Sequence, residues 1–432
     1  MDQTLSQLAA ERGIKYYLVS FTDLAGTQRA KLVPAAASDD VESVGAAFAG
    51  FAAWMGMNPG DPDLFAIADR STLVQLPWKP EVGWMAADLR LNGAPLPQGP
   101  RSTLRRQIAR AAERDLTMKT GVEAEFFLLD ELGESLADCA DRQSKPCYDQ
   151  AALMRQYDLI AEICDAMAKL GWRPYQNDHE DGRGQFEMNW AFDDALITAD
   201  RHVFFKFMVK TLAERRGLRA TFMPKPFSDL TGNGCHVHVS LWRGEINLFD
   251  EPNDALGLSG MAYHFIGGLL NSAAGLTALL NPTVNSYKRI NGMRPESGAT
   301  WSPSSISYAG NNRTHMIRIP DGGRLELRLA DGAANPYLLQ AGILAAGLDG
   351  LDRSRDPGTP QSTNAYLELC ASGKLELLPG NLLDALRALS ASEVLRSAFE
   401  GLLEPYVELK TKEWDAHMAH LSDWERAVTL DC

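Results

Sequence analysis

GVEAEFFLLD, residues 121–130, is the stretch that decides the fold. Val122 and Ala124 alternate with Glu123 and Glu125, which is the period of a β-strand with one buried face. Residues two apart point the same way, so both carboxylates project from one face, roughly 6–7 Å apart. Two carboxylates that share a space repel each other unless a cation or a shared proton lies between them. The alternative is an edge strand whose glutamates face solvent.

Three later segments, residues 184–190, 235–241 and 324–329, repeat this division into one apolar and one polar face. The polar faces carry side chains of the kind found in active sites: Gln185, Glu187, Asn189, His236, His238, Ser240, Arg324, Glu326 and Arg328. The apolar faces are expected to pack against helices, which leaves the polar faces to converge on one cleft.

The polar faces, together with a loop glutamate, supply five carboxylates and one imidazole: Glu123, Glu125, Glu180, Glu187, Glu326 and His236. Oxygen ligands with one nitrogen favour Mg²⁺ or Mn²⁺ over a structural zinc. Six such ligands divide between two ions that keep open positions for substrate. Metal ions beside basic residues are typical of a phosphoryl-transfer site, and five arginines are available: Arg289, Arg313, Arg318, Arg324 and Arg328. Each arginine alone is equally well explained as an ion-pair residue, and His238 alone as a core histidine, so this prediction depends on their joint placement.

The whole chain has 432 residues and a formal net charge of −14, which argues against nucleic acid or a membrane surface as a partner. The six cysteines form no CxxC pair, so a reduced, cytoplasmic location is expected. No basic segment followed by an apolar run marks a signal peptide at the N-terminus. Residues 255–287 contain no charged side chain except for histidine, but asparagines, glycines and a proline interrupt them, so a buried helix and a loop are predicted.

The chain length predicts two domains. Strands are expected at 15–21, 27–33 and 64–76, and the glycines and prolines at 93–100 are expected to form a linker. The boundaries that follow are 12–98 for a small, mostly β domain and 99–432 for a large one. In the large domain, apolar spacing and capping signals predict helices, at 102–115 (capped by Ser102), 152–170, 199–216, 257–280, 336–352, 381–390 and 393–420.

Several motifs, in this order, closely resemble those of the glutamine synthetase family, and the resemblance covers nearly the whole chain. They are GVEAEFF at 121–127, HE at 179–180 with GQFE at 184–187, FMPKP at 222–226, GNGCHVH at 232–238, NR at 312–313 with IRIP at 317–320, RLELR at 324–328 and ANPY at 334–337. The resemblance implies an α+β protein. A small N-terminal β-grasp domain would precede a large catalytic domain of the glutamine synthetase/guanido kinase type, whose curved antiparallel sheet is packed by helices.

The resemblance also implies roles for individual residues. Positions matching the first metal ion's ligands are Glu125, Glu180 and Glu187, and those matching the second are Glu123, His236 and Glu326. Positions matching glutamate binding are Gly232, Arg289 and Arg328. Positions matching ATP and its phosphates are Phe192, His238, Ser240, Arg313, Arg318 and Arg324, and Arg313 is also expected to act in catalysis.

Members of this family phosphorylate the side-chain carboxylate of glutamate with ATP, and an amine then attacks the acyl phosphate. A mobile loop shields this intermediate from water. Family members also form rings in which the N-terminal domain of one subunit completes the site of the next. The resemblance therefore implies two or more Mg²⁺ or Mn²⁺ ions, ATP as a substrate, and self-association into stacked rings, a dodecamer being expected.

The chain departs from the ammonia-utilising members of the family at the amine site. Those members carry an Asp-Gly-Ser-Ser stretch whose aspartate helps to bind ammonium. The matching residues 48–54 here read FAGFAAW, with Ala49 at the acidic position. The loss of a carboxylate weakens a site for a small cation, and Phe51 and Trp54 favour an amine that carries an alkyl group. The alternative is that another acid substitutes.

Two further departures concern catalysis. Asp178 precedes His179 and Glu180 where the family has His-His-Glu, so Asp178 is a candidate for binding or deprotonating the amine. A solvated loop aspartate is the simpler alternative. The shielding loop reads INGMRPE at 290–296, with its glutamate one place later than in the ammonia enzymes, so the lid role falls to Glu296. Residues 373–379 lack the tyrosine that is adenylylated in many bacterial relatives, which argues against that control.

These observations predict an ATP-dependent, ADP-forming glutamate–amine ligase that uses methylamine and yields γ-glutamylmethylamide. The alternatives are a glutamine synthetase that uses ammonia and a ligase for a larger amine such as a polyamine. A non-catalytic relative retained as a structural oligomer is disfavoured, because all six metal positions are filled.

Overall fold

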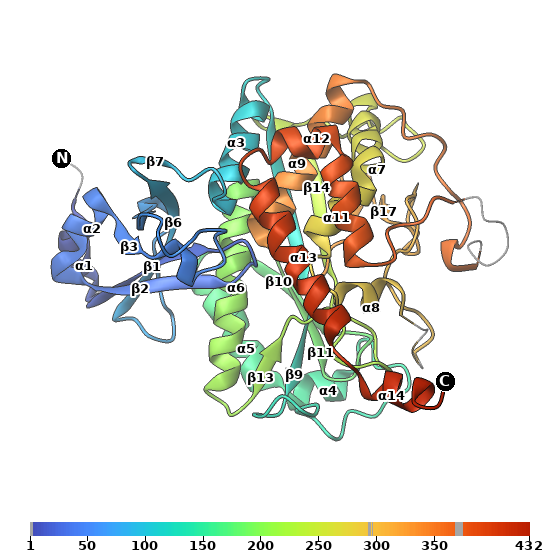
Figure 1. Ribbon diagram of the computed structural model, residues 1–432, viewed down its shortest axis with the longest axis horizontal. Coiled ribbons are helices and arrows are strands. Elements are labelled where there is room, and N and C mark those ends of the chain that lie inside the picture. Colours follow the sequence, from blue (N-terminus) through green and yellow to red (C-terminus); the bar gives the residue numbers. More distant parts are fainter. Residues whose placement is uncertain (1–2, 293–294, 296, 368–374) are drawn as a thin grey trace.

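The N-terminal part of the chain is built on one mixed sheet. The computed structural model describes residues 3–292, 295, 297–367 and 375–432. Strands β1 (Tyr16–Thr22), β2 (Gln28–Pro34), β3 (Ala46–Phe48), β4 (Leu64–Ala68) and β6 (Val82–Leu91) lie in the order β2-β1-β6-β4-β3. Only β1 and β6 in this path are parallel, and the short strands β5 (Val74–Gln75) and β7 (Ala94–Pro95) pair with β6. Helices α1 (Leu5–Arg12) and α2 (Ser38–Val44) complete this part, which lies to one side of the molecule in Figure 1.

Two expectations for this part are corrected. The run 64–76 is not one strand, because the Asp69 carboxylate caps a 3-10 turn at Arg70–Thr72 by accepting the backbone N–H of Ser71. The expected linker instead turns back on β6 at Asn92 and Gly93, both of which have positive φ, and forms β7. The domain boundary at 98/99 stays a prediction.

Two further sheets form the body of the protein. The first contains β12 (Asp193–Asp194), β8 (Thr117–Ala124), β14 (Cys235–Arg243), β18 (Leu325–Leu327), β17 (Ile317–Arg318) and β16 (Tyr308–Ala309) in that order, with β15 (Ile246–Asn247) paired to β14. All of its neighbours are antiparallel except β16 and β17. The second has the order β10 (Pro174–His179), β11 (Gln185–Trp190), β9 (Phe126–Leu129) and β13 (Arg219–Thr221).

The stretch 121–130 joins these two sheets rather than forming one strand. The ladder of β8 ends at Ala124, and β9 begins at Phe126 in the other sheet. Glu125 lies at the junction, where its backbone N–H donates to Gly234 O over 3.2 Å. The predicted alternation therefore holds only up to Ala124, and residues 126–129 are buried on both sides.

Helices surround the sheets. They are α3 (Pro100–Ala112), α4 (Gln150–Arg155), α5 (Tyr157–Lys169), α6 (Ala195–Glu214), α7 (Gly260–Leu280), α8 (Ser286–Ile290), α9 (Pro336–Asp352), α11 (Leu382–Ala391), α12 (Glu393–Ala398), α13 (Leu403–Ala419) and α14 (Asp423–Thr429). All of these helices except α14 bury side chains against the body. Helices α7 and α9 lie in close contact in the core, because a Cβ on Gly268 would come within 2.1 Å of Ala346 O. The uncharged stretch 255–287 thus forms a buried helix and a loop, and no described helix is long and apolar enough to cross a membrane.

Three helix predictions were wrong in detail. The helix expected at 152–170 is two helices, α4 and α5, which are interrupted at Gln156. Helix α3 begins at Pro100 with Gly99 as its N-cap, and Ser102 is buried within its first turn instead of capping it. The helix expected at 393–420 is broken into α12 and α13 near Gly401, whose φ of +78° lies in the left-handed region that favours glycine.

Candidate active site

Strand register brings three of the predicted ligands together. In the antiparallel sheet His236 on β14 lies opposite Glu123 on β8, and the neighbouring strand β18 contributes Glu326. His236 Nδ1 lies 3.5 Å from Glu123 Oε2 and 3.6 Å from Glu326 Oε1. One ligand atom from each of the three residues falls within 4.8 Å of the others. This is the group that the family resemblance assigned to the second metal ion.

A second group adjoins the first through the same histidine. Ligand atoms of Glu125, Glu187 and His236 also lie within 4.8 Å of one another. Glu180, which was expected in this group, lines the same cavity from the turn after β10 but is not among these closest atoms. The Nε2 atom of His236 is buried and accepts or donates no hydrogen bond to any described residue. An unpartnered nitrogen among carboxylate oxygens fits a divalent cation.

The carboxylates perturb one another's titration. Burial raises the pKa of Glu187 well above its ordinary value, and the charges of Glu123, Glu180 and Glu125 raise it further. Burial, Glu125 and Asp178 likewise raise the pKa of Glu180. Carboxylates that face one another in this way can all be ionised only when cations lie between them.

Asp178 lies in the wall of this cavity, as does Arg313. Burial, followed by the charges of Glu123 and Glu125, raises the pKa of Asp178 to about 6. The cavity has a volume of about 150 Å³. Four lining residues were not anticipated from the sequence, since they come from loops and an edge strand that carry no periodic signal: Cys147, Tyr148, Gln176 and Trp301.

Of the residues expected to hold glutamate, Arg328 lines the carboxylate cavity, and Arg289 and Gly232 lie outside its lining. Arg328 Nη1 lies 2.5 Å from Glu326 Oε1. Arg289 is buried and donates to Leu329 O over 3.2 Å. A Cβ on Gly232 would come within 2.3 Å of Pro224 O and 3.0 Å of Arg289 Cγ, so only glycine fits beside that guanidinium.

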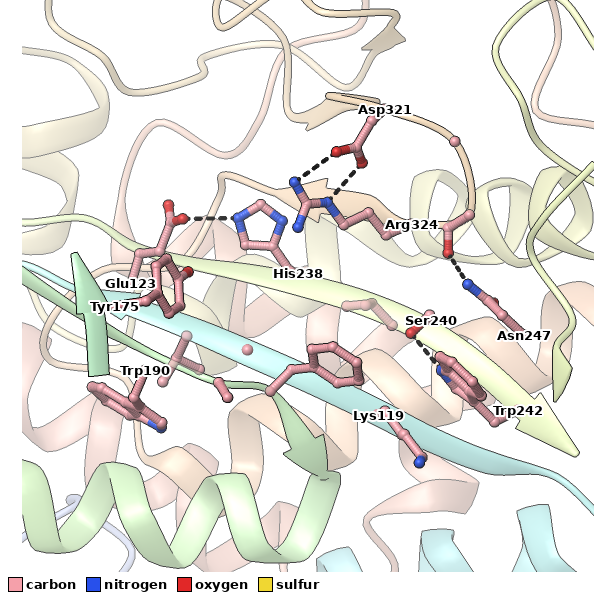
Figure 2. A pocket seen from close by; sticks show the side chains of 17 residues that line it. Lys119, Glu123, Tyr175, Trp190, His238, Ser240, Trp242, Asn247, Asp321 and Arg324 are labelled. Carbon is pink, nitrogen blue, oxygen red and sulfur yellow. Dashed lines mark hydrogen bonds and ion pairs between the residues drawn. The ribbon is translucent and has the colours of Figure 1, made fainter. Parts of the chain in front are cut away.

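A second, larger cavity of about 470 Å³ shares Glu123 with the first. Figure 2 shows this cavity and the side chains that line it. It contains four of the residues expected near ATP: Phe192, His238, Ser240 and Arg324. The other two, Arg313 and Arg318, line the carboxylate cavity instead.

The larger cavity is aromatic at one end and polar at the other. The rings of Phe192 and Trp242 are stacked with centroids 6.3 Å apart, and Lys119 Nζ lies 4.8 Å from the Trp242 ring centroid. His238 Nε2 lies 2.9 Å from Glu123 Oε1, so His238 faces the cavity rather than the core. A planar base suits the aromatic end, and a polyphosphate suits the end that leads to the carboxylates. Trp242 and Lys119 were not anticipated from the sequence.

Two expected features lie elsewhere. Residues 48–54 belong to β3 and the adjoining 3-10 turn (Gly50–Ala52), and they line neither cavity of their own chain. Phe51 and Trp54 are 53% and 56% exposed there. Glu296 lies outside the described residues, as do Gly373 and Lys374.

Comparison with known proteins places this site in a family. Residues 97–429 match the family described as glutamine synthetase, catalytic domain. The chain belongs to the glutamine synthetase family, whose members are ligases that use ATP and divalent metal ions.

Its relatives include enzymes of more than one name. Glutamine synthetase from Rhizobium leguminosarum bv. phaseoli is 55% identical over 434 residues, covering 100% of both chains. Glutamate–methylamine ligase from Methyloversatilis universalis is 45% identical over 429 residues, covering 97% of both. The solved structure of a GmaS/ADP complex superposes with a TM-score of 0.97 at 58% identity, covering 100% of both chains.

Proposed function

We propose that this protein is an ADP-forming glutamate–amine ligase whose amine is methylamine and whose product is γ-glutamylmethylamide. The observation that carries the ligase chemistry is the convergence of Glu123, His236 and Glu326 between the aromatic cavity and the buried arginines. This arrangement would set the γ-phosphate of ATP beside the side-chain carboxylate of glutamate.

The chain's own residues supply binding and orientation. Phe192 and Trp242 would hold the base of ATP, and Arg313, Arg318 and Arg324 would neutralise its phosphates. Arg289 and Arg328, beside Gly232, would hold glutamate. Glu123, His236 and Glu326 would hold one divalent ion and Glu125, Glu180 and Glu187 another; these ions offset charge on the phosphates. The GmaS relative solved with ADP supports the nucleotide assignment.

The reaction has two steps. An oxygen of the glutamate side-chain carboxylate attacks the γ-phosphorus, and ADP leaves. The amine nitrogen then attacks the acyl carbon of γ-glutamyl phosphate, and phosphate leaves. Asp178 lines the cavity and its pKa is raised to about 6, which supports a role for it in accepting the proton that the attacking amine would lose.

The choice of methylamine rests on residues 48–54. Ala49 replaces the acid of the ammonia-utilising enzymes, and Phe51 and Trp54 are exposed on the surface of their own chain. In a ring, these residues would reach the site of the next subunit. Large apolar side chains that are exposed on a single subunit support assembly into a ring. The C-terminal segment exposes more of them: Met418, Leu421, Trp424, Val428 and Leu430.

The second candidate is a glutamine synthetase that uses ammonia, which the Rhizobium relatives support. A ligase for a larger amine is the third. The deciding experiment measures phosphate release by the purified protein with ATP, Mg²⁺ and glutamate over concentration series of methylamine, ammonium and a polyamine. The quantity that discriminates is the ratio of kcat/KM values. A higher value for methylamine supports the proposal, a higher value for ammonium replaces it with glutamine synthetase activity, and no turnover with any amine refutes ligase function.

A further inference from the structure

Asp181 is a buried carboxylate beside the active site to which neither the sequence analysis nor the proposed mechanism gives a role. It follows Glu180 directly, in the turn between β10 and β11, and is 7% exposed. Its backbone N–H donates to Glu180 Oε2 over 3.1 Å. It belongs to neither group of closely spaced ligand atoms.

The Asp181 side chain binds the segment 297–301, which follows the position of the expected lid residue. Asp181 Oδ2 accepts hydrogen bonds from Ser297 Oγ and from Trp301 Nε1, the second over 2.8 Å. Trp301 lines the carboxylate cavity. A single carboxylate oxygen thus ties both ends of the segment to the turn that carries Glu180.

The backbone of Trp301 adopts an unfavourable conformation. Its φ of +55° lies in the left-handed region, which is unfavourable for a bulky L-residue. Further contacts to the segment are long: Arg328 Nη2 lies 3.5 Å from Trp301 O and Thr231 Oγ1 lies 3.4 Å from Thr300 O. The hydrogen bond from Trp301 Nε1 to Asp181 is shorter than either of these, so it is the better placed to offset the backbone strain.

The turn that carries Asp181 is itself held firmly. The backbone N–H of Gly182 donates to Gln185 Oε1 over 2.9 Å, and a Cβ on Gly182 would come within 2.6 Å of the Phe127 ring. Asp141 Oδ2 lies 2.7 Å from His179 Nε2 and accepts the Gly184 N–H over 2.6 Å. A fixed turn can position a segment that contacts it.

We propose that Asp181 is a positioning residue that holds the segment 297–301 over the carboxylate cavity and so keeps water away from the acyl phosphate. The inference rests on the proposed function. When the segment is held, the amine attacks the acyl carbon, the carbon–oxygen bond to phosphate breaks, and each ADP corresponds to one amide. When it is released, water attacks the same carbon, the bond to phosphate breaks, and glutamate is regenerated and phosphate released without formation of amide.

The test measures the ratio of ADP to amide that the full-length protein forms in the same reaction under single-turnover conditions. Asp181→Asn weakens both hydrogen bonds, Trp301→Phe keeps an aromatic ring but removes its N–H, and Ser297→Ala removes the other donor. Asp229→Asn, at the more exposed aspartate that pairs with Arg183, is the matched control. We expect one ADP per amide in the wild type and the control, and a rise of about tenfold in uncoupled ADP formation per lost charge-assisted hydrogen bond.

A purely structural role would lower the overall rate without changing this ratio. If Trp301→Phe and Ser297→Ala both keep one ADP per amide, the positioning role is refuted even when Asp181→Asn fails to fold. If the wild type forms no ADP with any amine, the proposed function fails, and this inference fails with it. Coupled turnover in the wild type and in all variants would refute the positioning role alone.

Discussion

Arg318 and Glu326 face each other across strands β17 and β18, with 2.6 Å between Arg318 Nη1 and Glu326 Oε2. Arg328 binds the other carboxylate oxygen. Burial would raise the pKa of Glu326, but the charges of Arg328, His236 and His238 lower it to about 2. The carboxylate therefore stays ionised throughout the range in which enzymes work, and it connects the expected phosphate-binding arginine to the expected metal group.

Replacing Glu326 with alanine is expected to reduce ATP turnover by about 10²-fold or more, because even groups that only orient a metal ligand contribute 10–100-fold. The measurement is glutamate- and amine-dependent ADP release as a function of Mg²⁺ concentration. Glu408→Ala, at an exposed pair with Lys412, is the control. Near-normal turnover by Glu326→Ala, with the same oligomer size on gel filtration, would show that Glu326 is not a metal ligand.

The parts of this site that were predictable from the sequence are those governed by strand periodicity. Alternation places Glu123 and His236 on polar faces, and antiparallel register then sets them opposite each other. The break at Glu125 was not predictable, because residues 126–129 are buried on both sides and an uninterrupted apolar run resembles the continuation of a strand. Strand β6 was missed because residues 83–87 are all buried, so this segment lacks the alternation of polar and apolar residues that marks a half-buried strand.

Side chains positioned only by tertiary contacts gave no signal. Trp301 lies in a loop, its own backbone is left-handed, and its side chain lines the carboxylate cavity. Its partner Asp181 lies about 120 residues away in the chain. Trp242 follows directly after the expected strand 235–241. Its place in the larger cavity depends on Phe192, which stacks against it from another segment. Periodicity is a property of one element and cannot report contacts between loops.

Replacing Ala49 with aspartate is expected to shift preference from methylamine toward ammonium. A carboxylate restores a partner for a small cation and withdraws apolar contact from a methyl group. A hydrogen bond to a charged group contributes roughly 1.5–3 kcal/mol, so the ratio of kcat/KM values should change by about tenfold or more. Ala94→Asp, at an exposed alanine of β7 outside residues 48–54, is the control. An unchanged ratio in Ala49→Asp would remove this argument for alkylamine use.

Replacing Arg101 with methionine is expected to destabilise the junction between the N-terminal sheet and the body. Arg101, on α3 and 4% exposed, makes two hydrogen bonds of 2.9 Å to Asp200 on α6. It also binds Asp69 and Asp88 from the N-terminal part, at 2.8 and 2.9 Å. Asp69 and Asp88 keep Arg105 as a partner, but among the described residues the buried Asp200 carboxylate keeps only the Tyr337 hydroxyl and no cation, which costs roughly 3 kcal/mol.

Urea unfolding at fixed protein concentration measures this cost. Arg114→Met, which breaks a more exposed pair with Asp352, should cost no more than about 1 kcal/mol. Equal effects of the two substitutions would mean that the Arg101 cluster contributes no more than a surface ion pair.

Lys206 should make stability depend on alkaline pH. Burial, and then the nearby charge of Lys210, lower the pKa of Lys206 from 10.5 to about 8, while its ammonium donates to Gly332 O over 2.6 Å. Because the unfolded state binds this proton more tightly, the free energy of unfolding should rise with pH between about 8 and 10.5. The slope contributed by Lys206 approaches 1.4 kcal/mol per pH unit, and the total is at most roughly 3 kcal/mol.

The substitution Lys206→Met removes this contribution, so the difference in unfolding free energy between wild type and variant should shift in favour of the wild type as the pH is raised from 7.5 to 10. Lys412→Met, which also removes one positive charge but at an exposed position, should give a difference that varies little with pH. Below pH 8 the folded wild type holds a charged ammonium in a buried position, which lowers its free energy of unfolding. The methionine variant avoids this cost but lacks the hydrogen bond to Gly332 O. A pH-independent difference for Lys206→Met would show that the pKa of the Lys206 ammonium is not lowered by its surroundings.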